Sequence, residues 1–242
     1  MNTLIVIPAR IASVRLPEKM LADIGGKPLI VRTWESAVSA GVGDVIVACD
    51  GAKIANEIEK AGGKAVLTDP ELLSGTDRVF AAWNLYDPER KYDFIINLQG
   101  DLPFIAPVFI READKIIRNT SYEMATLATP IKDDSYMHNS VVKPVISFTS
   151  ENSGKALYFS RSAVPSGGPF LHHVGIYCFR ANGLEKFVNL PMSPLEKSEK
   201  LEQLRAIENN IEIGITVVDA DPPISIDTAD DLALARRVYG EK

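Results

Sequence analysis

The sequence predicts an α/β protein with a doubly wound, mostly parallel sheet and a smaller antiparallel insertion. Three features of the 242-residue chain support this class: short apolar runs recur along the first half, helix-like segments separate them, and there is no repeat or low-complexity segment. Strands that are covered on both faces of a parallel sheet are apolar along their whole length. Alternation of such strands with helices is typical of doubly wound folds.

The first half contains the most regular alternation. Strands are expected at the apolar, β-branched runs of residues 4–7, 45–48, 65–67, 94–98 and 124–128. Helices are expected at residues 28–40, 52–61, 76–85 and 107–117. Pro28 suits a first helical turn and Gly41 follows the last one. In the second helix, Ile54, Ala55 and Ile58 share one face.

The second half is less regular. Strands are expected at residues 141–148, 174–179 and 211–218, with a short strand at 157–159. Helices are expected at residues 182–190, 199–209 and 230–238. Because no linker separates the halves, we expect a single domain over residues 1–242, with the antiparallel insertion at about residues 130–180.

The charge balance argues against a general nucleic-acid binder. The chain has 26 basic and 32 acidic residues, a net charge of -6, whereas nucleic-acid binders usually present a basic face. Basic residues nevertheless outnumber acidic ones between Pro8 and Arg32, where Arg10, Arg15 and Lys19 lie. This segment favours a small anionic ligand. A solvated charged face is the alternative interpretation.

The chain is expected to be cytoplasmic, with no membrane partner. No apolar run reaches transmembrane length, and the N-terminus lacks the basic region of a signal peptide. Cys49 and Cys178 are far apart in the sequence and fit neither a zinc site nor a redox pair. Two isolated cysteines are compatible with a reducing compartment.

Three polar segments follow predicted strands, at residues 8–19, 74–78 and 99–103. In open α/β sheets, ligands bind beyond the carboxyl ends of the strands, so these segments are expected to converge. The pair Gly26 and Lys27 is not a Walker A motif, because Pro28 stands where a magnesium-binding Ser or Thr would be, and no G-x-G-x-x-G follows the first strand. Small residues beside arginine and lysine suit a triphosphate.

Seven segments in order resemble one family. They are residues 7–10 (IPAR), 74–78 (SGTDR), 97–103 (NLQGDLP), 156–161 (ALYFSR), 172–177 (HHVGIY), 202–205 (EQLR) and 226–228 (IDT). Ser13, Arg15, Lys19 and the motif Gly26-Lys27-Pro28 extend the first segment. The chain is similar to the CMP-KDO synthetases (3-deoxy-manno-octulosonate cytidylyltransferases), although many members have glutamate where Leu102 stands.

The resemblance implies a Rossmann-like nucleotidyltransferase fold and a magnesium-dependent reaction. CMP would pass from CTP to the acidic eight-carbon sugar KDO, with release of pyrophosphate, for lipopolysaccharide synthesis. The family is commonly dimeric, which makes the 130–180 insertion the candidate homodimer interface and sugar-side subdomain.

The resemblance also implies individual roles. CTP would be bound by Ala9, Arg10, Ser13, Lys19, Arg78 and Gln99. Magnesium would be bound by Asp101 and Asp227, which with Arg10 and Lys19 form the expected catalytic set. The sugar would be bound by Arg161, His173, Tyr177, Glu202 and Gln203.

Several of these residues could instead have a purely structural role. Asp101 and Asp227 are also suited to turns and helix caps, and Thr228 can cap the last helix while Asp227 stays available for a metal. His173 and Tyr177 are expected on one exposed strand face, with Gly175 leaving room between them. Arg161 suits a bidentate contact with a sugar carboxylate, the C-terminal cap of a helix, or an ion pair with a surface acid such as Glu151.

Other functions remain open. The same reaction on 8-amino-8-deoxy-KDO or a sialic acid is the nearest alternative. A glycosyltransferase would use the D-x-D pattern of Asp219 and Asp221, and a non-catalytic nucleotide-binding regulator would retain only the site.

Overall fold

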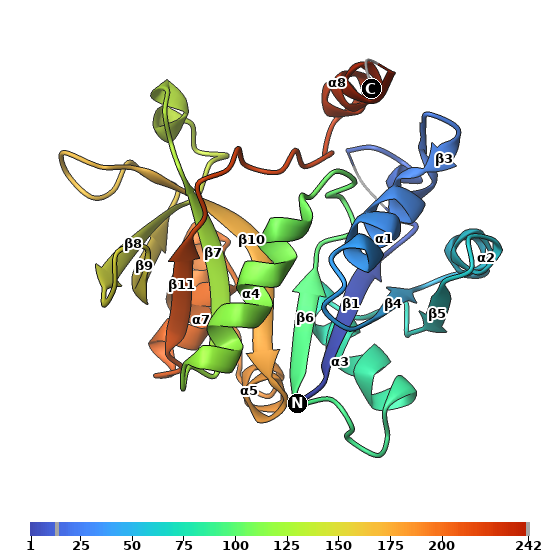
Figure 1. Ribbon diagram of the computed structural model, residues 1–242, viewed down its shortest axis with the longest axis horizontal. Coiled ribbons are helices and arrows are strands. Elements are labelled where there is room, and N and C mark those ends of the chain that lie inside the picture. The colour runs from blue at the N-terminus through green and yellow to red at the C-terminus, as the bar shows by residue number, and fades with distance from the viewer. Residues whose placement is uncertain (13–14, 241–242) are drawn as a thin grey trace. The chain divides into compact units, whose positions relative to one another are not determined.

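The computed structural model describes residues 1–12 and 15–240 (Figure 1). The chain divides into two compact units. The first consists of Met1–Ile110 with Pro223–Lys242, and the second is Arg111–Pro222. The second unit includes the 130–180 segment. The description as a single domain with an insertion stays a prediction.

The first unit contains a parallel sheet. Its strands β1 (Thr3–Ala9), β4 (Asp44–Cys49), β5 (Lys64–Leu67) and β6 (Phe94–Leu98) lie in the order β5-β4-β1-β6. All four were predicted from apolar runs, and β1 and β6 are buried along their whole length. The chain proceeds outward from β1 through β4 to β5 and then returns to β6 on the other side of β1. This reversal between β1 and β6 is where doubly wound sheets bind ligands.

Helices connect these strands. They are α1 (Leu29–Ser39), α2 (Ala52–Lys60) and α3 (Gly75–Tyr86), with α4 (Pro107–Asn119) at the boundary of the units and α8 (Ala229–Gly240) near the C-terminus. The 3-10 helix η1 (Lys19–Leu21) and the short hairpin of β2 (Asp23–Ile24) and β3 (Lys27–Pro28) lie between β1 and α1. Ser74 caps α3, because its hydroxyl accepts a hydrogen bond from the Asp77 backbone N–H at 3.0 Å.

The second unit contains a mixed sheet. Its strands β7 (Met124–Pro130), β8 (Lys143–Phe148), β9 (Ser153–Ser160), β10 (Leu171–Arg180) and β11 (Ile213–Val217) lie in the order β10-β7-β11-β9-β8. Only β7 and β11 pair in parallel, so the predicted antiparallel character is confirmed for this part of the chain. The strand expected at residues 157–159 is the end of the longer β9.

The helix expected at residues 199–209 is wrong in its boundaries. The structure has α6 (Pro194–Glu199) and α7 (Gln203–Glu208), after α5 (Ala181–Val188) and the 3-10 helix η2 (Asp134–Met137). The first starts early because Ser193 and Glu196 form a capping box around Pro194. It ends at Lys200, which has a left-handed φ of 56°. In the part of the chain described, no helix is both long and apolar enough to cross a membrane.

Candidate active site

A cavity of about 320 Å³ lies in the first unit, beyond the carboxyl ends of β1 and β6. Residues from the segments 8–12, 15–20, 72–78 and 99–101 contribute to its lining, together with Asp227. Figure 1 shows β1 and β6 side by side, which brings the segments after them together. The three polar segments predicted to converge therefore do so. Gly100 allows the close approach, since a Cβ there would lie 2.8 Å from the Pro8 carbonyl oxygen.

The lining of this cavity includes a lysine between two carboxylates. The Lys19 Nζ lies 2.9 Å from Asp101 Oδ2 and 3.0 Å from Asp227 Oδ1. Arg15 adds a second cation, with its Nη2 3.0 Å from the same Asp227 oxygen. The backbone N–H of Ile226 donates to the Asp101 carbonyl at 3.0 Å, which joins the C-terminal segment to the loop after β6.

Thr228 and Asp231 organise the turn that carries Asp227. The Asp231 backbone N–H donates to the Thr228 hydroxyl at 3.2 Å, and the Asp231 carboxylate accepts from the Asp227 backbone N–H at 3.0 Å. Capping is thus done by Thr228 and Asp231, as the sequence suggested for Thr228. The Asp227 carboxylate takes no part in these caps and reaches Lys19 instead.

The carboxylate pair fits a magnesium ion. Asp101 and Asp227 offer hard oxygen atoms that are close enough to share one cation, because both contact the same lysine nitrogen. Among the residues the structure describes, no cluster of three or more His, Cys, Asp or Glu side chains could hold a metal. Substrate phosphate oxygens would therefore have to complete the coordination, as they commonly do for magnesium.

The other predicted nucleotide-side residues have different surroundings. Ala9 is buried at the end of β1, and Arg10 is exposed at the cavity. Arg78 is buried and donates to the Thr68 hydroxyl at 2.6 Å and to the Asp69 carbonyl at 3.2 Å. Gln99 lines the cavity, and its Nε2 donates to Asn97 Oδ1 at 3.1 Å. Ser13 lies outside the described residues.

The predicted sugar-side residues lie in the second unit. His173 and Tyr177 share one face of β10, with ring centroids 5.7 Å apart, and the space at Gly175 is open as expected. The expectation of an exposed face is wrong, since both side chains are buried between neighbouring aromatic rings. The Tyr177 hydroxyl donates to Gln203 Oε1 on α7 at 3.0 Å.

Burial keeps these groups uncharged. Desolvation, with a smaller contribution from His172, lowers the pKa of His173 to about 3. His173 is therefore neutral near pH 7 and cannot serve as a cation for a sugar carboxylate. Burial also raises the pKa of Tyr177 well above its ordinary value. The buried Gln203 Nε2 has no hydrogen-bond partner among the described residues, so it is a donor that a ligand could satisfy.

The sequence did not single out Thr126, a polar residue in the apolar strand β7. Its hydroxyl lies 2.9 Å from His173 Nε2 and donates to the Ile176 carbonyl at 2.8 Å. Because the one hydroxyl hydrogen is used at Ile176, His173 Nε2 must be the donor toward Thr126, which assigns the proton to that nitrogen. The Nδ1 of His173 is then an acceptor. The one threonine in the apolar run of residues 124–128 was the sequence feature that could have pointed to a polar contact in this strand.

Arg161 follows β9 and caps α6. Its Nε donates to the Glu199 carbonyl at 2.9 Å, and its Nη1 donates to the Asn139 carbonyl at 3.0 Å. This is the capping alternative that the sequence left open. Glu202, at the N-terminus of α7, is half-buried. The substrate roles of Arg161 and Glu202 stay predictions.

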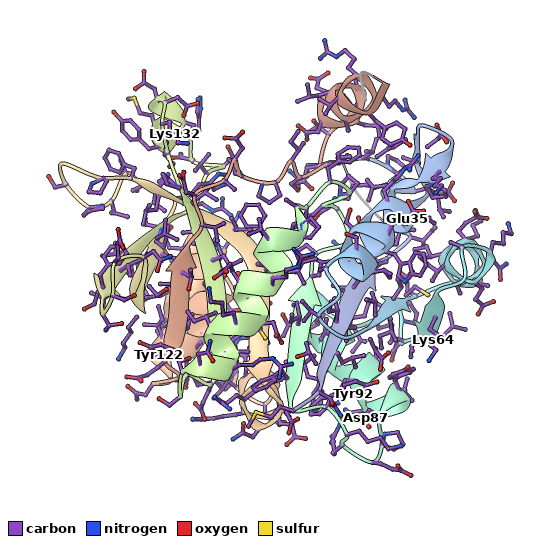
Figure 2. The ribbon with its side chains drawn as sticks, viewed as in Figure 1. Glu35, Lys64, Asp87, Tyr92, Tyr122 and Lys132 are labelled. Atoms are coloured by element: carbon purple, nitrogen blue, oxygen red, sulfur yellow. The ribbon has the colours of Figure 1, made fainter. Side chains whose placement is uncertain are left out.

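The D-x-D alternative has no support in the geometry. Asp219 belongs to the second unit, and its side chain is 86% exposed beside Lys132, 3.5 Å away, which is labelled in Figure 2. Neither Asp219 nor Asp221 lines the cavity described above. Both cysteines are buried and free.

Comparison with known proteins agrees with this arrangement. Residues 4–213 match the Cytidylyltransferase family. The chain is 45% identical to a 3-deoxy-manno-octulosonate cytidylyltransferase of Paramagnetospirillum magneticum, over 98% of this chain and 97% of that protein. It is 48% identical to the enzyme of the same name from Parvibaculum lavamentivorans, over 100% of this chain and 94% of the relative.

Solved structures agree as well. A CMP:2-keto-3-deoxy-manno-octonic acid synthetase complexed with CTP superposes with a TM-score of 0.90 at 37% identity, covering 100% of this chain and 99% of that one. A nucleotidyl transferase from Methanothermobacter thermautotrophicus, at 14% identity and a TM-score of 0.64, shares the fold. Full-length similarity at this level, together with the motif residues gathered at the cavity, shows that the chain belongs to the 3-deoxy-manno-octulosonate cytidylyltransferase (CMP-KDO synthetase) family.

Proposed function

We propose that this protein transfers the cytidylyl group of CTP to the anomeric hydroxyl of KDO, in lipopolysaccharide synthesis. The hydroxyl oxygen attacks the α-phosphorus, the bond from that phosphorus to the β-phosphate oxygen breaks, and pyrophosphate leaves with its electron pair. The hydroxyl proton passes to solvent. The observation that carries the proposal is the cavity beyond β1 and β6, in which Arg10, Lys19 and the pair Asp101 and Asp227 occupy the positions matching the family's motifs.

Positioning and charge stabilisation account for this chemistry without a covalent intermediate. Arg10 and Lys19 are cations at the cavity and would neutralise the β- and γ-phosphates. The N-terminus of α3 also faces the cavity through Ser74 and Gly75, and its backbone N–H groups favour a nearby anion.

The magnesium requirement is part of the proposal. Asp101 and Asp227 would hold the ion, which when bound supplies positive charge at the α-phosphate and lowers the pKa of the attacking hydroxyl.

The sugar is assigned to the second unit. Gln203 Nε2, a buried donor without a partner among the described residues, and His173 Nδ1, an acceptor, are suited to sugar hydroxyls. The guanidinium of Arg161 is the candidate for the sugar carboxylate. A homodimer and a cytoplasmic location remain predictions from the sequence.

Pyrophosphate release tests the proposal. The protein, CTP and magnesium would be incubated with KDO, 8-amino-8-deoxy-KDO, a sialic acid or a neutral hexose. We expect release with KDO and little with the hexose. Turnover only with another acidic sugar would change the substrate, and no turnover with any sugar despite CTP binding would favour a nucleotide-binding regulator.

A further inference from the structure

Four charged groups at the cavity of the first unit form one connected set. Lys19 bridges Asp101 and Asp227, and Arg15 contacts the Asp227 oxygen that also contacts Lys19. Two positive charges therefore face two negative ones. We call this set the cation-carboxylate cluster, and its cations contact one oxygen of each carboxylate that a metal ion would use.

The two cations differ in exposure. The Lys19 side chain is 9% exposed, whereas the Arg15 side chain is 67% exposed. An ammonium group that is largely withdrawn from water is costly to leave without an anionic partner. A divalent cation that bound both carboxylates without nucleotide would compete with Lys19 for them. The largely buried ammonium group would then be left without its anionic partners.

A triphosphate changes that balance. When a metal ion and a triphosphate bind together, the metal ion binds the carboxylates. The phosphate oxygens then become the anionic partners of Lys19 and Arg15 in the same cavity. We infer that Lys19 and Arg15 are placeholder cations, which occupy the metal-binding carboxylates in the nucleotide-free protein and transfer to the phosphates when the metal and nucleotide bind together.

This inference rests on the proposed function for its assignment of CTP and a divalent metal to the cavity. It adds a thermodynamic consequence that the reaction itself does not require. Metal and nucleotide must strengthen each other's binding by the same factor, because the coupling between two ligands is reciprocal. The opposing possibility is a permanent ion-pair cluster, in which Lys19 never leaves the carboxylates.

The test measures Mn²⁺ binding to the nucleotide-free protein by electron paramagnetic resonance, without sugar or turnover. We expect Lys19→Met to bind Mn²⁺ about tenfold more tightly than the unchanged protein, since couplings of about 5- to 150-fold are typical. Arg15→Met should give a smaller gain and should also weaken CTP binding. Lys53→Met is the matched control, because Lys53 forms an exposed ion pair with Glu18 in the same unit.

A double variant, Lys19→Met with Asp101→Asn, places the binding at the cluster, and we expect it to lose the gain. Equal Mn²⁺ affinity in Lys19→Met and the unchanged protein would overturn the inference. If Lys19→Met does not fold, the exposed Arg15 decides: Mn²⁺ affinity unchanged by Arg15→Met overturns it as well. Failure of the proposed function is a separate result, namely no pyrophosphate release from CTP in a protein whose Mn²⁺ affinities follow the expected order.

Discussion

Lys143 in the second unit offers a sharp test of buried-charge energetics. Its side chain has no exposed surface, and its ammonium group donates to the carbonyls of Val141 at 2.7 Å, His138 at 3.2 Å and Arg161. Burial, and then the charge of Arg161, lowers the pKa of Lys143. We propose Lys143→Met as the perturbation, because methionine keeps an unbranched side chain of similar length and removes the charge.

The expected loss follows from two opposing terms. Three partly buried carbonyls lose a charged donor, and each such hydrogen bond contributes about 1.5–3 kcal/mol. The variant no longer buries an ammonium ion, so a desolvation penalty on the order of several kcal/mol is removed from the folded state. We therefore expect the free energy of unfolding to fall by about 2–4 kcal/mol.

Urea unfolding followed by far-ultraviolet circular dichroism measures this change. Lys155→Met is the control, because Lys155 forms an exposed ion pair with Glu212 on the same sheet, and such pairs contribute about 0–1 kcal/mol. A Lys143→Met midpoint equal to that of Lys155→Met would refute the reasoning. It would mean that the three carbonyls find other donors or that the desolvation term cancels their loss.

Four further outcomes are expected. Asp101→Asn should lose more than about 90% of turnover with unchanged circular dichroism, and a variant that keeps a tenth of the rate, about 1.4 kcal/mol of barrier, excludes a direct role for the carboxylate. The kcat/KM for CTP should exceed that for UTP by at least about a hundredfold. A site whose hydrogen-bond acceptors bind the cytosine amino group leaves those acceptors unpaired when UTP binds. Equal kcat/KM values for the two nucleotides would contradict this expectation. Arg161→Lys should raise KM for the sugar and leave KM for CTP unchanged, whereas lower stability with unaltered KM values indicates capping alone. The pKa of His173 is about 3 in the folded protein and about 6.5 in the unfolded chain, so below pH 6.5 the unfolded chain binds a proton that the folded protein does not. The free energy of unfolding should therefore fall between pH 6.5 and 3 by up to about 1.4 kcal/mol per pH unit. In His173→Gln this slope should flatten, and an unaltered pH profile would show that His173 is not the group responsible.

The strands of the first unit could be predicted because their apolar runs have one simple cause. A strand such as β1 is buried on both faces, so nearly every position must be apolar, and the sequence displays this directly. The break between α6 and α7 has a different cause. Arg161, 38 residues before Glu199, donates to the Glu199 carbonyl and satisfies the helix end there. A local pattern cannot reveal a cap that is supplied from so far along the chain.

The candidate site also contains features that local sequence patterns predict and features that they do not. The cavity loops were predicted because each follows a strand, and the sheet brings the carboxyl ends together. The position of Lys19 between Asp101 and Asp227 was not predicted, since Asp227 reaches the cavity only through the packing of the C-terminal segment.

That packing depends on α8, which contains Tyr239 and Arg236. The Tyr239 ring lies 4.0 Å beneath the Arg32 guanidinium and against Gly25, where an added Cβ would lie 2.0 Å from the ring. Arg236 Nε donates to the Asp23 carbonyl at 2.9 Å. Gly25 has a φ of 60°, so any other residue there would be strained and would also push against the helix that follows Asp227. The position of Asp227 thus depends on packing at Gly25, near the other end of the chain, and a loss of α8 packing would reach the candidate active site through the turn at Thr228.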